Sequence, residues 1–223
     1  MNSYEVEIKS LLGAKENADL LLEKLKADPS FVAHGEHKQL NHYFIGGDLT
    51  RLYENAEMHI AEDKRDVFKQ LCYDAKEFSV RTRKADEKVI LVIKASVDDT
   101  TSSNGTARLE FESEVNMSLE ELDKILIESG FSYQAKWSRE RQEYTYKGMN
   151  VSIDKNAGYG YLAEFEKISD DASRVEGIKD EIRNAMSEIG LMELPQDRLA
   201  RMFEYYNNNW EDYYGTDKVF NIE

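Results

Sequence analysis

The chain has 223 residues, and 41% of them are hydrophobic. These values suit one domain of above-average size or a domain with a small appendage, and they exclude wholesale disorder. Lys and Arg number 29 against 44 Asp and Glu, a net charge of −15, so we expect no nucleic acid and no anionic membrane among the partners of the chain.

The cysteine content and the hydropathy pattern point to a cytoplasmic protein. Cys72 is the one cysteine, which excludes an intrachain disulfide and any metal site built from several cysteines. The N-terminus has no basic-then-apolar leader, and the longest aliphatic run, 89–93, is too short to cross a bilayer. We therefore expect a soluble protein in a reducing cytoplasm.

The first third of the chain predicts two strands and two helices, in the order strand 4–10, helix 15–27, strand 39–46 and helix 51–72. Leu21 and Leu25 recur at helical spacing in the first helix, which should end near Pro29. Gly46 and Gly47 end the second strand. The second helix carries many charges between its apolar residues.

The middle of the chain predicts three strands joined by short turns and then a helix. The strands are expected at 78–84, 88–96 and 106–115, and Asn104-Gly105 before the third is a strong hairpin signal. The helix begins with a capping box of Ser118 and Glu121 and should stop at Gly130.

The last third predicts strands at 139–146, 150–155 and 161–168, a helix at 172–189, and a final helix that begins near Pro195. Together the chain has eight strands, mostly antiparallel because their connections are short, and five amphipathic helices. Nothing marks a domain boundary before about residue 195. We therefore expect a main domain at 1–193, with 194–223 as a C-terminal helix and an aromatic, polar tail packed on it.

Charged residues alternate with apolar ones along several of these strands. In the first strand Glu5, Glu7 and Lys9 lie opposite Val6 and Ile8. Glu-x-Glu recurs at 110/112/114 and 164/166, and Arg-x-Arg occurs at 81/83 and 139/141. Any one strand fits an ordinary sheet with one solvated face. Like charges repeated two residues apart need opposite charges on neighbouring strands, so the set favours a charged face with a function.

Eight strands are also enough for a sheet to close into a barrel. The charged faces would then line the interior, and the helices would cover the apolar exterior. Clustered arginines and lysines suit a polyphosphate, because guanidinium groups bind phosphate oxygens in bidentate fashion. Clustered carboxylates suit Mg²⁺ or Mn²⁺ bridging those oxygens. We expect an α+β fold, an eight-stranded antiparallel closed β-barrel with amphipathic helices on the outside.

The ordered set of charged motifs resembles the CYTH superfamily, the triphosphate tunnel metalloenzymes. The resemblance covers roughly residues 4 to 168 and rests on Glu5-x-Glu7-x-Lys9, Arg81-x-Arg83, Lys94, Glu110-x-Glu112, Arg139-x-Arg141-x-x-Tyr144, Asp154, and Gly160 followed by Glu164-x-Glu166. It implies a triphosphate tunnel, dependence on a divalent metal, and a small-molecule triphosphate as substrate. The charged insertion at 51–72 resembles the cyclase-type and thiamine-triphosphatase-like prokaryotic branch.

The resemblance also implies roles for these residues. The triphosphate would be bound by Lys9, Arg81, Arg83, Lys94, Arg139 and Arg141. One or two Mg²⁺ or Mn²⁺ ions would be held by Glu5, Glu7, Glu110, Glu112, Asp154, Glu164 and Glu166. Lys9, Glu5 and Glu7 would be the catalytic residues.

Three functions remain open at this point. The first is metal-dependent hydrolysis of inorganic triphosphate, thiamine triphosphate or a nucleoside triphosphate. The second is a class IV adenylyl cyclase that converts ATP to cyclic AMP and pyrophosphate. The third is a non-catalytic module that binds polyphosphate or a nucleotide. Tyrosine and tryptophan on the helix exteriors would also allow a homodimer.

Overall fold

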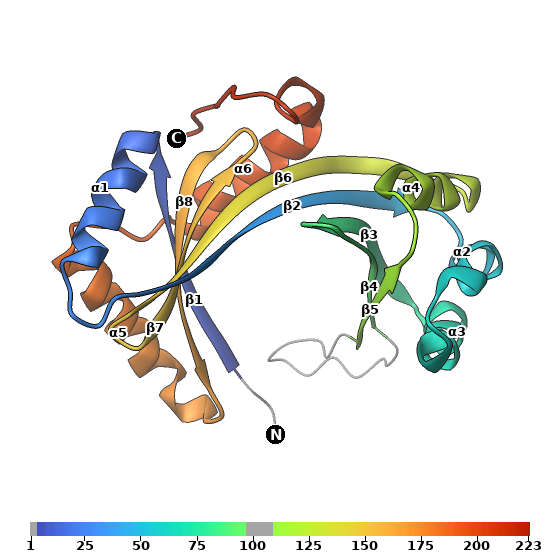
Figure 1. Ribbon diagram of the computed structural model, residues 1–223, viewed down its shortest axis with the longest axis horizontal. Coiled ribbons are helices and arrows are strands. Elements are labelled where there is room, and N and C mark those ends of the chain that lie inside the picture. Colours follow the sequence, from blue (N-terminus) through green and yellow to red (C-terminus); the bar gives the residue numbers. More distant parts are fainter. Residues whose placement is uncertain (1–3, 97–108) are drawn as a thin grey trace. The chain divides into compact units, whose positions relative to one another are not determined.

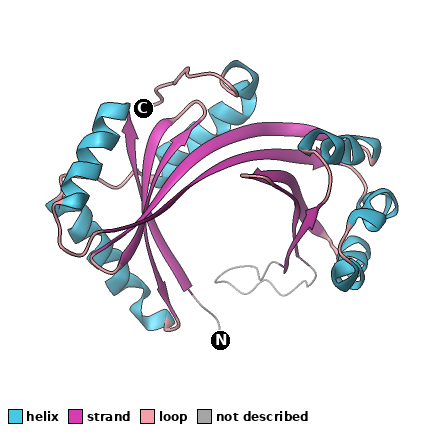
Figure 2. Ribbon diagram, in the orientation of Figure 1, coloured by secondary structure: helices cyan, strands magenta, loops and turns pink. Residues whose placement is uncertain are grey.

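The computed structural model describes residues 4–96 and 109–223, and it describes the backbone only for Tyr4, Glu5, Ser96, Leu109, Glu110 and Ala172. The expected turn at Asn104-Gly105 lies outside these residues. The elements, in chain order, are β1 (Tyr4–Gly13), α1 (Lys15–Lys26), β2 (Val32–Gly46), α2 (Leu49–Ala56), α3 (Arg65–Asp74), β3 (Glu77–Ala85), β4 (Lys88–Ser96), β5 (Leu109–Val115), α4 (Leu119–Glu128), β6 (Phe131–Tyr146), β7 (Met149–Asn156), β8 (Gly160–Ser169), α5 (Val175–Glu188) and α6 (Gln196–Asn209) (Figure 1). This is the α+β class that we predicted, with all eight strands in place (Figure 2).

The eight strands form one sheet in the order β1-β8-β7-β6-β2-β3-β4-β5. The ladders β1–β8, β8–β7, β7–β6, β2–β3, β3–β4 and β4–β5 are antiparallel. The described residues contain no ladder between β1 and β5, so the closed barrel that we expected is wrong and the sheet is open.

On each of the two end strands, a backbone carbonyl accepts a hydrogen bond from a residue outside the sheet. The backbone N–H of Leu194 donates to the carbonyl of Lys9 in β1 at 2.7 Å. The Nζ of Lys64 donates to the carbonyl of Glu112 in β5 at 2.8 Å. Closure of a sheet needs its two end strands to pair with each other, and these bonds use carbonyls of both strands instead.

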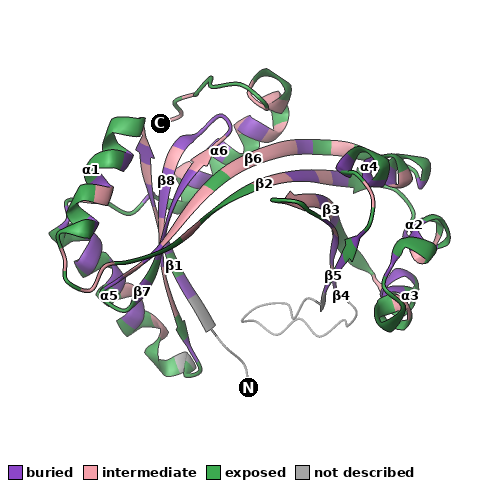
Figure 3. Ribbon diagram, viewed as in Figure 1, coloured by how far each residue is buried: buried purple, intermediate pink, exposed green. Residues whose placement is uncertain are grey.

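The chain divides into two compact units, each with its own hydrophobic core. The first unit comprises Met1–Lys38 and Ser138–Glu223, and the second comprises Gln39–Trp137. In the first unit Val6, Ile8 and Phe165 of the sheet pack with Leu25 of α1 and Ile182 of α5. Figure 3 shows the buried sides of these two helices. Helices therefore cover the apolar face of β1, β8 and β7, and the charged side chains of these strands lie on the other face.

The second unit repeats this arrangement with different elements. Val80, Leu91 and Phe111 of β3, β4 and β5 pack with Leu52 of α2 and Phe68 of α3 in one core. Leu119, Leu122 and Leu126 of α4 join the same core. Ser118 and Glu121 form the capping box predicted for α4. Cys72 is buried here, and burial raises the pKa of its thiol to about 12.

Strands β2 and β6 begin much earlier in the chain than the sequence predicted. β2 begins at Val32 rather than at residue 39, and β6 begins at Phe131 rather than at residue 139. Each strand passes from one unit into the other, because the division falls after Lys38 and after Trp137.

The helix expected at 51–72 is two helices. α2 ends at Ala56 and α3 begins at Arg65, with two short 3-10 turns between them. Ile60 has an extended backbone and is 1% exposed, and the side chain of Arg65 donates to its carbonyl. The break turns the chain so that Ile60 reaches the core of the second unit. None of the described helices is long and apolar enough to cross a membrane.

Candidate functional site

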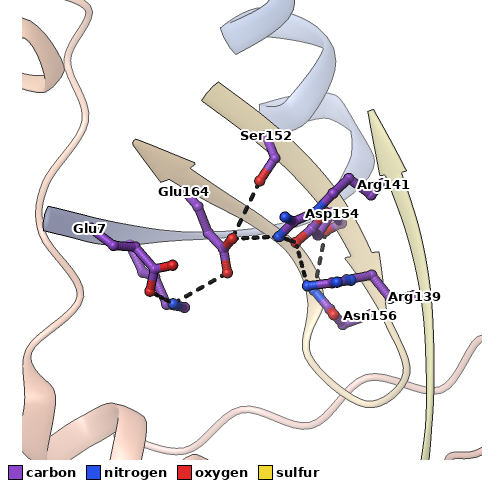
Figure 4. Close-up of polar contacts among 8 residues, drawn as sticks. Glu7, Arg139, Arg141, Ser152, Asp154, Asn156 and Glu164 are labelled. Atoms are coloured by element: carbon purple, nitrogen blue, oxygen red, sulfur yellow. Dashed lines mark hydrogen bonds and ion pairs between the residues drawn. The ribbon is translucent and has the colours of Figure 1, made fainter. Parts of the chain in front are cut away.

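The first unit brings one set of the predicted residues together on the charged face of four neighbouring strands. Alternation places these side chains on the face opposite the core that α1 and α5 cover. They are Glu7 and Lys9 of β1, Glu164 and Glu166 of β8, Asp154 of β7, and Arg139 and Arg141 of β6. Figure 4 labels Glu7, Arg139, Arg141, Asp154 and Glu164. We call these seven residues the charged cluster.

Arg141 lies at the centre of the charged cluster. Its Nε and one terminal nitrogen donate to the two carboxylate oxygens of Asp154 at 2.8 and 2.6 Å, and that nitrogen also contacts Glu164. The register explains the first contact, because Arg141 and Asp154 are directly opposite in the β6–β7 ladder. Arg139 adds an ion pair to Asp154 at 3.6 Å. Asp154 is therefore held by two arginines, and its side chain is only 2% exposed.

Lys9 connects the first strand to the same cluster. Its Nζ lies 3.2 Å from Glu164 and also contacts Glu7. Lys9 and Glu164 are opposite each other in the β1–β8 ladder, so the strand pairing itself brings these charges together. Glu164 is thus shared by a lysine of β1 and an arginine of β6.

Burial and charge shift the pKa values of these groups in different directions. Burial raises the pKa of Asp154, and the contacts with Arg141 offset only part of this effect. Burial would also raise the pKa of Glu164, but the charges of Arg141 and Lys9 outweigh it and lower the pKa. For Lys9, burial would lower the pKa, but Glu164 and Glu7 raise it instead. Glu164 and Lys9 are therefore held in their charged forms.

A pocket of about 230 Å³ opens next to Arg141 and Glu164. Its polar lining includes Glu166, Asn150 and His34. This volume is smaller than that of a typical drug-sized site, and polar groups supply much of its wall. The pocket gives a small polar molecule access to the charged cluster.

The sequence prediction missed two side chains that support the cluster. Ser152 donates to Glu164 at 3.4 Å, and Asn156 donates to the carbonyl of Asp154 at 3.4 Å. Both lie two residues from Asp154 in β7, on the same face of the strand. The alternation that selected Asp154 also marks these positions, although neither residue is charged.

The carboxylates of the cluster fit a hard divalent cation by their chemistry. Glu7 and Glu166 are directly opposite in the β1–β8 ladder, and like charges in such positions repel each other unless a cation lies between them. Carboxylate oxygens are the ligands that Mg²⁺ and Mn²⁺ prefer. In the described residues no three His, Cys, Asp or Glu side chains already lie together as a metal site. The side chain of Glu5 lies outside the described part, and the expected metal site stays a prediction.

The second unit holds the other predicted residues on its own charged face. Arg81 donates to the hydroxyl of Tyr43 at 3.0 Å. Arg83 donates to Asn41 at 3.1 Å and pairs with Glu112 at 3.2 Å. The sequence prediction missed Asn41 and Tyr43, which occupy alternate positions of β2 and hold the two arginines from the neighbouring strand.

Lys94 of β4 is opposite Glu110 of β5 in the ladder, and Val92 is opposite Glu112. The side chain of Glu110 lies outside the described part. Glu114, the third member of the run, pairs with Lys88 at 3.3 Å. The structure thus places Arg81, Arg83 and Glu112 together, and it places the backbone of Glu110 beside Lys94.

Comparisons with known proteins agree with these motifs. The family model of the CYTH domain matches residues 3–198. A search of curated proteins finds no match. Among solved structures, the PH1819 protein from Pyrococcus horikoshii is similar at a TM-score of 0.54 and 19% identity, covering 91% of this chain and 99% of its own.

Two further solved structures are similar to the chain. A conserved hypothetical protein from Pyrococcus furiosus has a TM-score of 0.52 and 22% identity, with 85% of this chain and 92% of that chain covered. A protein from Vibrio parahaemolyticus, named as a candidate adenylate cyclase, has a TM-score of 0.55 and 12% identity, with 92% and 99% covered. At these identities the likeness shows the fold alone. The family match spans most of the sequence and includes the whole charged cluster, so the chain belongs to the CYTH domain family.

Proposed function

We propose that the chain hydrolyses a triphosphate in a reaction that depends on a divalent metal ion. The substrate would be inorganic triphosphate, thiamine triphosphate or a nucleoside triphosphate. The observation that carries the proposal is the contact of Arg141 with both Asp154 and Glu164 beside an accessible pocket. A partly buried arginine with a bidentate fork, held by carboxylates, is suited to exchange part of its contacts for phosphate oxygens.

The residues of the charged cluster would divide the work by their charge. Lys9, Arg139 and Arg141 would bind the phosphate oxygens and orient the chain of phosphates. Asp154 would keep the guanidinium of Arg141 in place, since it already accepts two hydrogen bonds from it. This assignment gives Asp154 a positioning role beside the metal-binding role that the resemblance implies. The participation of Arg81, Arg83 and Lys94 in binding the triphosphate stays a prediction from the sequence.

Glu7, Glu164 and Glu166 would hold the metal ion, with Glu5 as a further candidate from the family motif. A bound Mg²⁺ or Mn²⁺ would neutralise phosphate charge and lower the pKa of a coordinated water. The charge of Lys9 beside Glu7 and Glu164 would fix the position of these carboxylates when the ion is absent.

An adenylyl cyclase is the second candidate, supported by the name of the Vibrio neighbour that shares the fold. Both reactions would use the same lysine and arginine side chains to bind a triphosphate. They differ in the phosphorus attacked, which is the terminal one in hydrolysis and the α-phosphorus of ATP in cyclisation. A non-catalytic polyphosphate-binding module would need lysine and arginine side chains but no carboxylates. The carboxylates of the charged cluster therefore favour an enzyme.

A product assay tests the proposal. Purified protein is incubated with Mg²⁺ or Mn²⁺ and, separately, with inorganic triphosphate, thiamine triphosphate and ATP, and the products are separated by chromatography. We expect orthophosphate from at least one triphosphate and no cyclic AMP. Cyclic AMP with pyrophosphate from ATP would replace the proposal by the cyclase. Absence of turnover with all three, together with measurable binding, would replace it by the binding module.

A pair of double variants separates catalysis from binding. Glu5→Gln with Glu7→Gln removes two carboxylates of the motif and should abolish turnover while inorganic triphosphate still binds by calorimetry. Glu16→Gln with Glu23→Gln removes the same charge from exposed positions of α1 and should leave turnover unchanged. Equal turnover in the two double variants would contradict the assignment of the metal-binding carboxylates.

A further inference from the structure

The C-terminal segment 199–223 lies beyond the residues that match the CYTH domain. It belongs to the first unit and packs on the turn between β7 and β8. The backbone N–H of Phe220 donates to the carbonyl of Gly158 at 2.9 Å, and Val219 and Gly158 form a parallel bridge. At the adjoining end of β7, Lys155 pairs with Asp217 at 2.9 Å. The segment is thus attached to the turn by backbone and side-chain bonds.

Aromatic rings fill the space between the segment and the turn. The ring centroid of Phe220 lies 5.0 Å from that of Tyr159, 4.9 Å from Tyr205 and 5.3 Å from Tyr213. Tyr206 stacks on Tyr159 at 5.7 Å and is fully buried. Such ring pairs stabilise beyond the area that they bury. We call these five residues the aromatic clamp.

Gly158 shows how tightly the clamp meets the turn. Its φ is +75°, and a Cβ at this position would lie 2.8 Å from the rings of Phe220 and Tyr206. Gly158 therefore combines a backbone conformation that favours glycine with a close approach of two rings. Any side chain there would push the segment away from the turn.

The turn that the clamp holds is directly connected to the charged cluster. The N–H of Ala157 donates to the carbonyl of Ser138 at 3.1 Å, next to Arg139. Arg139 is opposite Asn156 in the ladder, and its side chain pairs with Asp154 two residues earlier in β7. The position of Arg139 relative to Asp154 thus depends on the end of β7, which the turn and the clamp hold in place.

We propose that the aromatic clamp is a positioning element of the candidate active site. It fixes the end of β7 and the start of the β6–β7 pairing so that Arg139 stays aligned with Asp154 for phosphate binding. The inference rests on the proposed function for its substrate, inorganic triphosphate, and it adds a segment outside the family match to the site.

The variant Phe220→Ala tests the inference. It should raise the KM for inorganic triphosphate about tenfold with a smaller change in kcat, because Arg139 is assigned to binding. Phe220→Leu should restore most of the affinity by refilling the space. Val219→Ala is the matched control, because the side chain of Val219 is 54% exposed and its backbone bridge to Gly158 is retained. Kinetics are measured well below the melting temperature of each variant, where a general loss of stability does not change KM.

Hydrogen exchange of the segment 150–160 supplies a readout that needs no turnover. Phe220→Ala should speed exchange there and leave α1 unchanged. If the unmodified protein hydrolyses no triphosphate, the proposed function fails. Hydrogen exchange alone then tests whether the clamp fixes the end of β7. Unchanged exchange in 150–160, or an unchanged KM in an active protein, would overturn the inference. If Phe220→Ala does not fold, Tyr213→Leu, which removes one partner ring of Phe220, takes its place with the same expectations.

Discussion

Arg141 is the residue on which the geometry of the charged cluster depends most directly. Its guanidinium reaches Asp154 with two nitrogens and Glu164 with one of them. A lysine has one compact charge and cannot reproduce a planar fork. The contacts at this position therefore depend on the planar shape of the guanidinium as well as on its charge.

Arg141→Lys should accordingly impair the protein although it keeps the charge. We expect a tenfold or greater loss of kcat/KM for the hydrolysed triphosphate and a free energy of unfolding lower by about 1–3 kcal/mol, because Asp154 loses part of its hydrogen bonding while buried. Enzyme assays and urea unfolding measure the two effects. Arg183→Lys is the control, because the Arg183 side chain is 45% exposed on α5 and the change should stay within about 0.5 kcal/mol. Full activity of Arg141→Lys would show that a point charge suffices.

For single residues, the sequence predicted on which face of a strand a side chain lies better than it predicted which side chains it contacts. Alternation along β1 and β8 placed Glu7, Lys9 and Glu164 on one face, and the structure confirms that face. It did not predict that Asp154 would be enclosed by Arg139 and Arg141. Spacing within a strand fixes a face, but the partner of a side chain depends on register between strands, which a single sequence does not specify.

Helix α4 offers the clearest example of an element fixed by a buried charge. Asp123 shares the buried face of the helix with Leu119 and Leu126. It accepts hydrogen bonds from His42 and Thr82 at 2.6 Å each and from Tyr133 at 2.7 Å. Burial would raise the pKa of Asp123, but these hydrogen bonds outweigh it and lower the pKa below its usual value of 3.8. The ionised carboxylate thus joins α4 to the sheet of the second unit.

Asp123→Asn should lower the free energy of unfolding at pH 7 by about 1–3 kcal/mol. A carboxyl group whose pKa is lower in the folded protein stabilises it above the unfolded pKa, and this stabilisation is lost as the pH falls through the folded pKa. The difference between the unmodified protein and the variant should therefore shrink below pH 3.8. Urea unfolding at pH 7, 4.5 and 3 measures it, with Glu120→Gln, exposed on the same helix, as the control. A difference that stays constant with pH would contradict the role of the ionised carboxylate.

Among the elements, the region between β2 and β3 shows why one helix was predicted and two were found. Leu52, Ala56 and Ile60 follow helical spacing, and Phe68 and Leu71 resume it. Between them, helical spacing calls for an apolar residue at position 63 or 64, and these positions are Asp63 and Lys64. A continuous helix would bury no apolar side chain at these positions and would gain little stability from packing. The break instead lets Ile60 reach the core.

Across the whole molecule, the two hydrophobic cores are separate groups of residues. Leu25 belongs to the core of the first unit and Leu52 to that of the second, and both are fully buried. We expected a closed barrel from the strand count, the charged strand faces and the family resemblance. That expectation failed because none of these decides whether the two end strands pair.

Matched cavity variants test how independent the two cores are. Leu25→Ala and Leu52→Ala should each lower the free energy of unfolding by about 2–5 kcal/mol. We expect Leu25→Ala to speed hydrogen exchange chiefly in the first unit and Leu52→Ala chiefly in the second, as mass spectrometry of exchanged peptides can measure. Faster exchange throughout the chain in both variants would mean that the units unfold as one.

The burial of Cys72 has a practical consequence for spectroscopy. The residue is 5% exposed, and the thiol pKa of about 12 leaves almost no thiolate at neutral pH. Maleimide dyes and spin labels react with the thiolate, so they should bypass this residue in the folded protein. Cysteines introduced at one exposed position in each unit would then carry the labels selectively, and the distance between them could be followed as triphosphate and metal are added.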